Sequence, residues 1–219
     1  MPQARVLNES EIRKVLKAIS FRRHATRDRT IFLLGLYSGM RAKELCSVRV
    51  CDVLTKDADV RDEIHLSSDQ TKGKRGRTVI LGKKARDLIK TYLCERYTTS
   101  DLQPILLTDT SRPLFTTQKN PRRGFSPNTL AGHFCTLMRE ANIEGGSSHS
   151  MRRSFITSLA DKGVSVRVLQ ELAGHANLQT TARYIAVNDA VMRRAVRLFA
   201  IVNFRLPSTL ILNAPLRND

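Results

Sequence analysis

Two pairs of side chains in this sequence could act on a phosphate group. Arg41 lies three positions before Glu44 in the segment Gly-Met-Arg-Ala-Lys-Glu-Leu, at the start of a predicted helix. His149 and Arg152 have the same spacing on another predicted helix, which puts an imidazole and a guanidinium on one face where both could reach one phosphate. Taken alone, the first pair is typical of a surface ion pair. The second is equally consistent with a solvated arginine behind a helix-starting histidine.

A histidine and a tyrosine further along the chain complete the candidate set. His175 lies at a break between two predicted helices, and Tyr184 stands nine residues later, inside the next predicted helix. A tyrosine hydroxyl can attack phosphorus, but its ordinary pKa of about 10 means that neighbouring groups must help it to lose its proton. Either residue alone is commonplace, because a tyrosine on a helix usually serves packing.

A strongly basic turn separates the first arginine from these later segments. Ile64 and Leu66 alternate with polar residues, and a β-branched run follows at residues 78–81. The intervening residues 72–76 read Lys-Gly-Lys-Arg-Gly, which predicts a β-hairpin with a basic turn.

Helical spacing surrounds this hairpin on both sides. Asn8 and Glu11 form a predicted capping box at the start of a first amphipathic helix near residue 9. Gly39 ends a predicted apolar core helix over residues 24–37. Further helices are predicted over residues 41–45, 83–97, 128–141, 150–162, 165–173, 178–187 and 188–202.

The stretch over residues 104–120 looks irregular, with a short strand at Leu114 and Phe115. The predicted fold class is therefore mainly α with a small antiparallel β-sheet, an α+β domain.

The composition favours a folded protein that binds nucleic acid. Its 37 Lys and Arg against 20 Asp and Glu leave a formal charge of +17, and a polyanion is the natural partner for such a charge. An anionic membrane is the competing partner, but the sequence shows neither a signal peptide nor an apolar run of the ~20 residues that a membrane span needs. The four cysteines are scattered, without the paired spacing of zinc ligands.

In this order and with these neighbours, the candidate residues resemble the tyrosine recombinase, or phage integrase, family. The matching pieces are residues 39–45 for the first arginine box, residues 149–153 for the His-x-x-Arg box, residues 174–175 for the third box, and Tyr184 for the nucleophile. The resemblance extends over roughly residues 8–190. It implies the tyrosine recombinase catalytic-domain fold and a site-specific DNA recombinase, of the integrase, invertase or resolvase type. Such an enzyme cleaves and rejoins DNA through a 3′-phosphotyrosyl bond, without metal, ATP or any other cofactor.

The resemblance also implies a role for each candidate. Arg41 and Arg152 would clamp the phosphate oxygens in the transition state, and Glu44 would brace the first arginine box. His149 would accept the tyrosyl proton, and His175 would donate a hydrogen bond to a non-bridging oxygen.

The family carries a catalytic lysine in a hairpin at this place in the chain. Lys72 is therefore assigned to protonate the departing 5′-oxygen, and Lys74 in the same turn is the alternative. The expected DNA contacts are Lys74, Arg75, Arg77 and Arg153, of which Arg153 stands where many relatives have a second histidine.

Most relatives carry an additional helical domain before the catalytic one. We expect residues 1–203 to form a catalytic domain alone, similar to compact members that lack the N-terminal core-binding domain, or an excised or degenerate catalytic domain. Residues 204–219 are expected to form a C-terminal tail that is exchanged between protomers, because the family's active tetramers assemble in that way.

The expected partners follow from this resemblance. They are double-stranded DNA and either three further copies of the chain on paired sites, or another recombinase or helper protein. A cytoplasmic, nucleoid-associated location is expected, with no membrane contact.

Two other functions would use similar residues. One is a topoisomerase-like enzyme that nicks and reseals DNA, and the other is an accessory DNA-binding protein that acts with a full-length recombinase. The DNA target, and the choice among integration, excision, inversion and resolution, stay open.

Overall fold

The computed structural model describes residues 4–71, 75–118, 120, 122–184, 193 and 197. The chain divides into two units, residues 1–184 and residues 185–219. Of the second unit the structure describes Arg193 and Arg197, which are both helical and exposed. The predicted domain boundary at residue 203, the predicted tail, and the lysines Lys72 and Lys74 lie outside the described residues.

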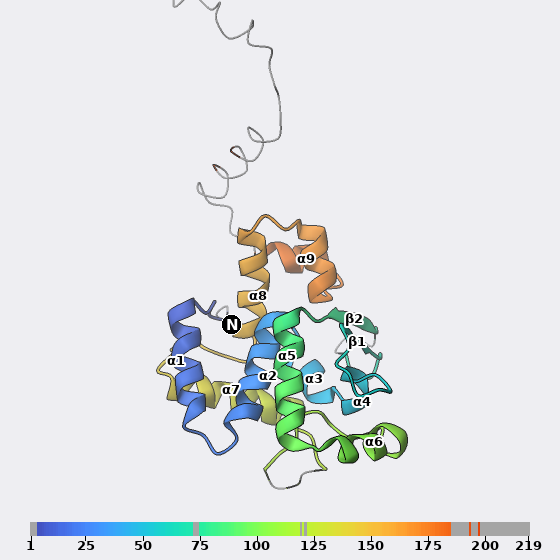
Figure 1. Cartoon of the computed structure of the whole chain (residues 1–219). Coiled ribbons are helices and arrows are strands. Elements are labelled where there is room, and N and C mark those ends of the chain that lie inside the picture. Colours follow the sequence, from blue (N-terminus) through green and yellow to red (C-terminus); the bar gives the residue numbers. More distant parts are fainter. Residues whose placement is uncertain are drawn as a thin grey trace, which may run out of the picture. The chain divides into compact units, whose positions relative to one another are not determined.

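The described part of the first unit is a helical body with one β-hairpin (Figure 1). Its elements are α1 (Glu9–Ser20), α2 (Ala25–Ser38), α3 (Ala42–Ser47), α4 (Val50–Val53), β1 (Glu63–Leu66), β2 (Arg77–Ile80), α5 (Lys83–Arg96), α6 (Thr99–Thr108), α7 (Pro127–Glu140), α8 (Ser150–Asp161), α9 (Val166–Ala173) and α10 (Leu178–Ala182). The mainly helical fold class with a small antiparallel sheet is therefore confirmed. None of the helices in the described ranges is long and apolar enough to cross a membrane.

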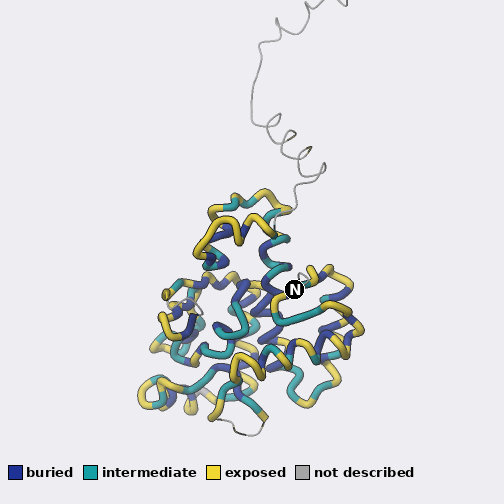
Figure 2. Tube along the Cα trace, turned by 180° about the vertical axis from the view of Figure 1, so that it is seen from behind, coloured by how far each residue is buried: buried dark blue, intermediate teal, exposed yellow. Residues whose placement is uncertain are grey.

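Helix α2 lies at the centre of this unit. It packs against α5 and α8, and its core residues Ile31, Phe32 and Leu34 are fully buried. A helix that is buried on every side needs apolar residues all round, and residues 31–36 supply them. Figure 2 shows that buried residues concentrate in the middle of the unit, with exposed residues in the surrounding loops and turns.

Local signals in the sequence set the start of α1 as predicted. Glu11 donates its backbone N–H to Asn8 Oδ1 over 2.9 Å, and Asn8 donates its own N–H to Glu11 Oε2 over 3.0 Å. This reciprocal capping satisfies two of the N–H groups that a helix start leaves open.

The hairpin pairs β1 with β2 in antiparallel register. Ile64 faces Val79, and Leu66 faces Arg77 at the end of the sheet nearest the basic turn. Ile64, Leu66 and Val79 are buried, which anchors one face of the hairpin on the helices. The hairpin thereby places Arg77 at one end of the sheet, opposite Leu66.

Three sequence predictions about secondary structure are wrong. Residues 104–108 are helical rather than irregular, because a capping box at Thr98 and Asp101 starts α6, and the helix continues through Pro104. Residues 114–115 are not a strand. They are buried between two isolated bridges, which join Arg49 to Pro113 and Thr116 to Gly124.

The third difference concerns the segment that holds Tyr184. Helix α10 ends at Ala182, and Tyr184 lies in the turn that follows it rather than inside the helix. Its N–H donates to the carbonyl of Thr181 over 3.0 Å, a tightened last turn of the kind that often closes a helix.

Candidate active site

The C-terminal ends of α2 and α9 lie beside one another at the candidate site. Both helices end at a glycine with left-handed backbone geometry, Gly39 at φ 61° and Gly174 at φ 62°. A Cβ on Gly39 would lie 2.5 Å from the ring of Phe155, and a Cβ on Gly174 would lie 2.5 Å from Cδ of Arg77. Glycine is therefore required at both positions for conformation and for space. The terminal carbonyl groups of both helices carry partial negative charge and attract cations.

Arg41 donates a hydrogen bond to one of these carbonyl groups. It is the N-cap residue of α3, and its Nη2 donates to the carbonyl of Gly174 over 3.2 Å. Glu44 is fully buried and accepts from both the backbone N–H and Nη1 of Arg41, over 2.8 and 3.0 Å. Glu44 thus holds Arg41 in place, and the pair is partly buried rather than the surface ion pair of which its spacing alone is typical.

Arg77 supplies a second cation to the same carboxylate. Its Nη2 and Nε donate to Glu44 over 2.8 and 3.3 Å, and its Nη1 donates to the carbonyl of Leu172 over 2.9 Å. Burial alone would raise the pKa of Glu44, but the hydrogen bonds and charges of Arg77 and Arg41 outweigh it and lower that pKa. Glu44 is therefore ionised at neutral pH.

Arg152 reaches the same place from α8. Its side chain is buried, and its Nη1 and Nη2 donate over 2.7 and 2.6 Å to the carbonyls of Gly39 and Ala173. One guanidinium therefore joins the ends of α2 and α9. Burial, followed by the charge of Arg41, lowers the pKa of Arg152 to about 9. The cation is held where it lacks the water that would normally solvate it.

His175 and Tyr184 lie against this cluster. The rings of His175 and Tyr184 are stacked, with centroids 5.6 Å apart and an angle of 16° between their planes. His175 Nδ1 is 2.9 Å from the hydroxyl of Thr181. Tyr184 is close enough to Arg152 to act on the pKa of that arginine.

The charges of this cluster do not balance. Arg41, Arg77 and Arg152 are three cations, and Glu44 is the carboxylate that faces them among the described residues. Burial and then the charges of the three arginines lower the pKa of His175 to about 4, so its ring is neutral at pH 7. The site therefore holds an excess of positive charge in a partly buried place, which is suited to an anion.

The structure brings Arg41, Arg152, His175 and Tyr184 together in the cluster just described. His149 is exposed at the N-cap of α8, three residues before Arg152. Two of the expected DNA contacts make hydrogen bonds outside this cluster.

These two contacts are Arg75 and Arg153. Arg75, the fourth residue of the basic turn, is exposed, and its carbonyl accepts from the Thr71 hydroxyl over 2.9 Å. Arg153 is half-buried on α8 and donates from Nη1 to the carbonyl of Ala4 over 2.7 Å.

Sequence reasoning missed two members of the site. Thr181 was not singled out, although it stands three residues, about one helical turn, before Tyr184. Arg77 was expected to contact DNA, and nothing in its spacing indicated that it would share the carboxylate of Glu44, 33 residues earlier. The alternation of the hairpin shows that Arg77 and Val79 share a face, which is the one available signal.

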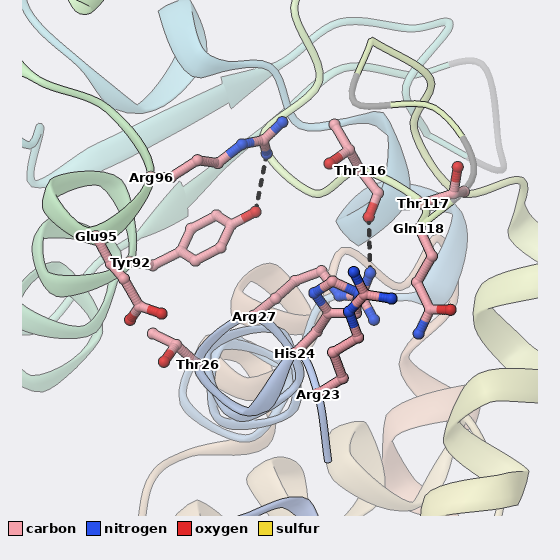
Figure 3. A pocket seen from close by; sticks show the side chains of 10 residues that line it. All are labelled: Arg23, His24, Thr26, Arg27, Tyr92, Glu95, Arg96, Thr116, Thr117 and Gln118. Atoms are coloured by element: carbon pink, nitrogen blue, oxygen red, sulfur yellow. Dashed lines mark hydrogen bonds between the residues drawn. The ribbon is translucent and has the colours of Figure 1, made fainter.

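A separate pocket of about 310 Å³ lies at the opposite end of α2 (Figure 3). Since α2 has 14 residues at a rise of about 1.5 Å each, this pocket is about 20 Å from Gly39. It holds Tyr92 among arginines, but burial raises the pKa of Tyr92, and its hydroxyl already accepts from Arg96 over 2.9 Å. Tyr92 is therefore poorly suited to lose its proton and act as a nucleophile. Among the residues that the structure describes, no group of His, Cys, Asp and Glu is arranged to hold a metal ion.

Comparison with known proteins identifies the family of this chain. The model of the phage integrase family matches residues 5–190. This chain belongs to the phage integrase family. The resemblance noted in the sequence is thus confirmed at the level of family and fold.

Tyrosine recombinases are among the most similar family members. The chain is 31% identical over 190 residues to the tyrosine recombinase XerA of Pyrococcus furiosus, which covers 87% of this chain and 60% of that protein. It is 33% identical over 198 residues to the XerA of Thermococcus kodakarensis, covering 89% and 62%. The chain therefore spans about 60% of the length of these curated relatives.

Solved structures show the same fold. A crystal structure of XerA recombinase matches 91% of this chain and 66% of its own with a TM-score of 0.65 and 26% identity. The Tn1549 transposon integrase, solved in complex with a circular intermediate DNA, matches 91% and 67% with a TM-score of 0.66. At 18% identity this second likeness bears on the fold alone.

Proposed function

We propose that this chain acts in site-specific recombination of double-stranded DNA and forms a covalent 3′-phosphotyrosyl bond at Tyr184. One observation carries the proposal. Arg41, Arg152, His175 and Tyr184 come from separate segments of the chain and meet where two helix ends and three guanidinium groups leave positive charge in excess. The named tyrosine recombinases among the relatives support the same class of reaction.

The charge of the cluster fits a phosphodiester. Arg41 and Arg152 each use part of their donors on backbone carbonyls, and a planar guanidinium has five N–H groups in all. The remaining donors are available to the two non-bridging oxygens, where negative charge grows in the transition state. The bound anion would also offset the desolvation that lowers the pKa of Arg152.

The chemical step then exchanges one phosphoester for another. The oxygen of Tyr184 bonds to phosphorus as the bond from phosphorus to the 5′-oxygen breaks, and the tyrosyl proton passes to His149. The departing 5′-oxygen takes a proton from Lys72, with Lys74 as the alternative donor. A 5′-hydroxyl can reverse the step on another strand, because the phosphotyrosyl bond retains the energy of the bond that was broken.

Arg77 has a different role in this proposal from the one its sequence suggested. Because Nε, Nη1 and Nη2 all donate inside the protein, we assign Arg77 to holding Glu44 and the Gly174 turn rather than to gripping DNA. Lys74, Arg75 and Arg153 remain the proposed DNA contacts. Assembly as a tetramer on paired sites, or with another recombinase, is part of the same proposal.

Covalent capture tests the mechanism without requiring that the DNA site be identified first. Purified protein is incubated with a pool of labelled duplexes that carry random sequence around a nick placed to trap the cleaved state. Protein-linked DNA is recovered after denaturation and sequenced. We expect an adduct with wild type and none with Tyr184→Phe.

Tyr97→Phe is the matched control, because it removes a hydroxyl that is buried without a hydrogen-bond partner among the described residues. That variant should form the adduct. If the pool contains sequences that the protein binds and none becomes attached to it, the phosphotyrosyl mechanism is wrong for this chain, and an accessory DNA-binding role is favoured.

A further inference from the structure

Thr181 connects the two rings of the candidate site. Its side chain is fully buried, and its hydroxyl lies 2.9 Å from Nδ1 of His175. Its backbone carbonyl accepts the N–H of Tyr184 over 3.0 Å. One residue therefore holds the imidazole through its side chain and the tyrosine through its backbone, while those two rings stack on each other.

The protons in this contact can be counted. A neutral imidazole has a single N–H, on either Nδ1 or Nε2, and a threonine hydroxyl has one proton to donate. His175 is neutral because it is buried beside Arg152, Arg41 and Arg77. Among the described residues the Thr181 hydroxyl has no hydrogen-bond partner besides His175.

Only one arrangement satisfies both groups. If the ring proton were on Nδ1, the hydroxyl would accept it and leave its own proton buried without an acceptor, which is unfavourable. If the ring proton is on Nε2, the hydroxyl donates to Nδ1, so that the hydroxyl proton and the Nδ1 acceptor are both paired. The environment thus selects the Nε2–H tautomer.

The rest of the segment keeps the ring in this orientation. The backbone N–H of His175 donates to the carbonyl of Gln170, and Nε2 of Gln170 donates to the carbonyl of His175, both over 3.0 Å. Tyr184 covers one face of the ring. With Nδ1 occupied by Thr181, Nε2 is the ring atom left to meet a ligand.

We propose that Thr181 is a positioning residue that holds His175 in the Nε2–H tautomer, so that the ring offers a hydrogen-bond donor to a non-bridging oxygen of the scissile phosphate. The phosphate contact rests on the proposed function, whereas the tautomer is a property of the free protein. The two parts can therefore be tested separately.

The tautomer is read by nitrogen NMR of DNA-free protein labelled with ¹⁵N-histidine. His175→Gln identifies the signals of that ring among the five histidines. In the wild type at neutral pH we expect a protonated Nε2 and an unprotonated Nδ1. Thr181→Val, which keeps the shape and removes the hydroxyl, should give a mixture of tautomers, and Thr181→Ser should restore the wild-type pattern.

The wild-type spectrum decides the first part even if Thr181→Val does not fold. A proton on Nδ1, an imidazolium ring at neutral pH, or an unchanged tautomer in folded Thr181→Val would each overturn the inference. Inorganic phosphate is the probe for the second part, and it should shift the Nε2–H signal of the wild type. No shift at saturating phosphate would overturn the phosphate contact.

The covalent-capture reaction gives the kinetic counterpart. Thr181→Val should form adduct about tenfold more slowly at saturating DNA, with little change in DNA affinity, and Thr181→Ser should be near wild type. An equal rate in Thr181→Val would contradict the positioning role. If the wild type forms no adduct while its tautomer is as described, the proposed function fails and the assignment of the Thr181 contact stands.

Discussion

Glu44→Gln should destabilise the DNA-free protein more strongly than any single surface charge change. The substitution keeps the size of the side chain and removes the negative charge that faces Arg41 and Arg77. A glutamine amide also places N–H donors against guanidinium donors, so part of the four-bond arrangement around Glu44 is lost.

The size of the effect follows from burial. Removing one partner of a buried ion pair typically costs about 3–5 kcal/mol, because the other charge is left uncompensated. Glu44 is 0% and Arg77 11% exposed, but Arg41 is 23% exposed and keeps some water. We therefore expect the lower end of that range, about 3 kcal/mol, which corresponds to a fall in Tm of roughly 6–12 °C for a chain of this size.

Thermal and urea unfolding of the DNA-free protein measure this loss. Glu171→Gln is the matched control, since it makes the same charge change in a pair with Arg167 that is 70% and 74% exposed. That surface pair should contribute no more than about 1 kcal/mol. Lowering the pH should reduce the difference in unfolding free energy between wild type and Glu44→Gln. The pKa of Glu44 is lowered on folding, so its contribution is complete above the ordinary value of 4.5 and is lost as the pH falls through the folded value.

Sulfate provides a second arm of the same test. An anion that enters the cluster should stabilise Glu44→Gln more than wild type, when compared with chloride at equal ionic strength. A Tm for Glu44→Gln as close to wild type as that of Glu171→Gln would refute the reasoning, because Glu44 would then not be neutralising the arginine cluster.

Three further predictions concern the rest of the site. The pKa of His175 is lowered from 6.5 to about 4 on folding, so the contribution of its neutral ring to stability is complete above pH 6.5 and is lost towards pH 4. In urea unfolding, the stability advantage of wild type over His175→Gln should therefore fall by about 3 kcal/mol over that range. A difference that does not change with pH would contradict this prediction. Gly174→Ala should lower the free energy of unfolding by about 2–4 kcal/mol in thermal unfolding, because the backbone has positive φ and the new Cβ would lie 2.5 Å from the side chain of Arg77. Gly163 also has positive φ, at 86°, but has open space around it, so Gly163→Ala should cost only about 1–2 kcal/mol. A mixture of the Tyr184→Phe and Arg152→Ala proteins should form no adduct in the covalent-capture reaction, because the tyrosine and the arginine serve the same site within one chain. More adduct than either variant forms alone would show that the tyrosine is supplied by another copy.

Most helix boundaries could be predicted because short-range signals set them. The Asn8 capping box and the left-handed Gly39 each act within one turn of helix, and both are found as the sequence indicated. Pro104 shows where such local rules fail. A proline usually interrupts a helix, yet Leu102 and Ile105 of α6 are buried in the core, and their packing outweighs the one lost backbone hydrogen bond.

The candidate residues could be singled out in the sequence because their order and neighbours resemble the boxes of the phage integrase family. What the sequence alone determined is therefore the family and the fold class, and the roles of the candidate residues stay predictions. Only the tertiary structure decided how those groups are held: that Arg152 bridges the ends of α2 and α9, and that Arg77 shares Glu44. It also decided that Thr181 binds His175. The contacts of Arg152 and Arg77 join residues from 21 to 113 positions apart in the sequence. These contacts and that of Thr181 depend on burial and side-chain direction, which are set by the packing of the whole domain rather than by local spacing.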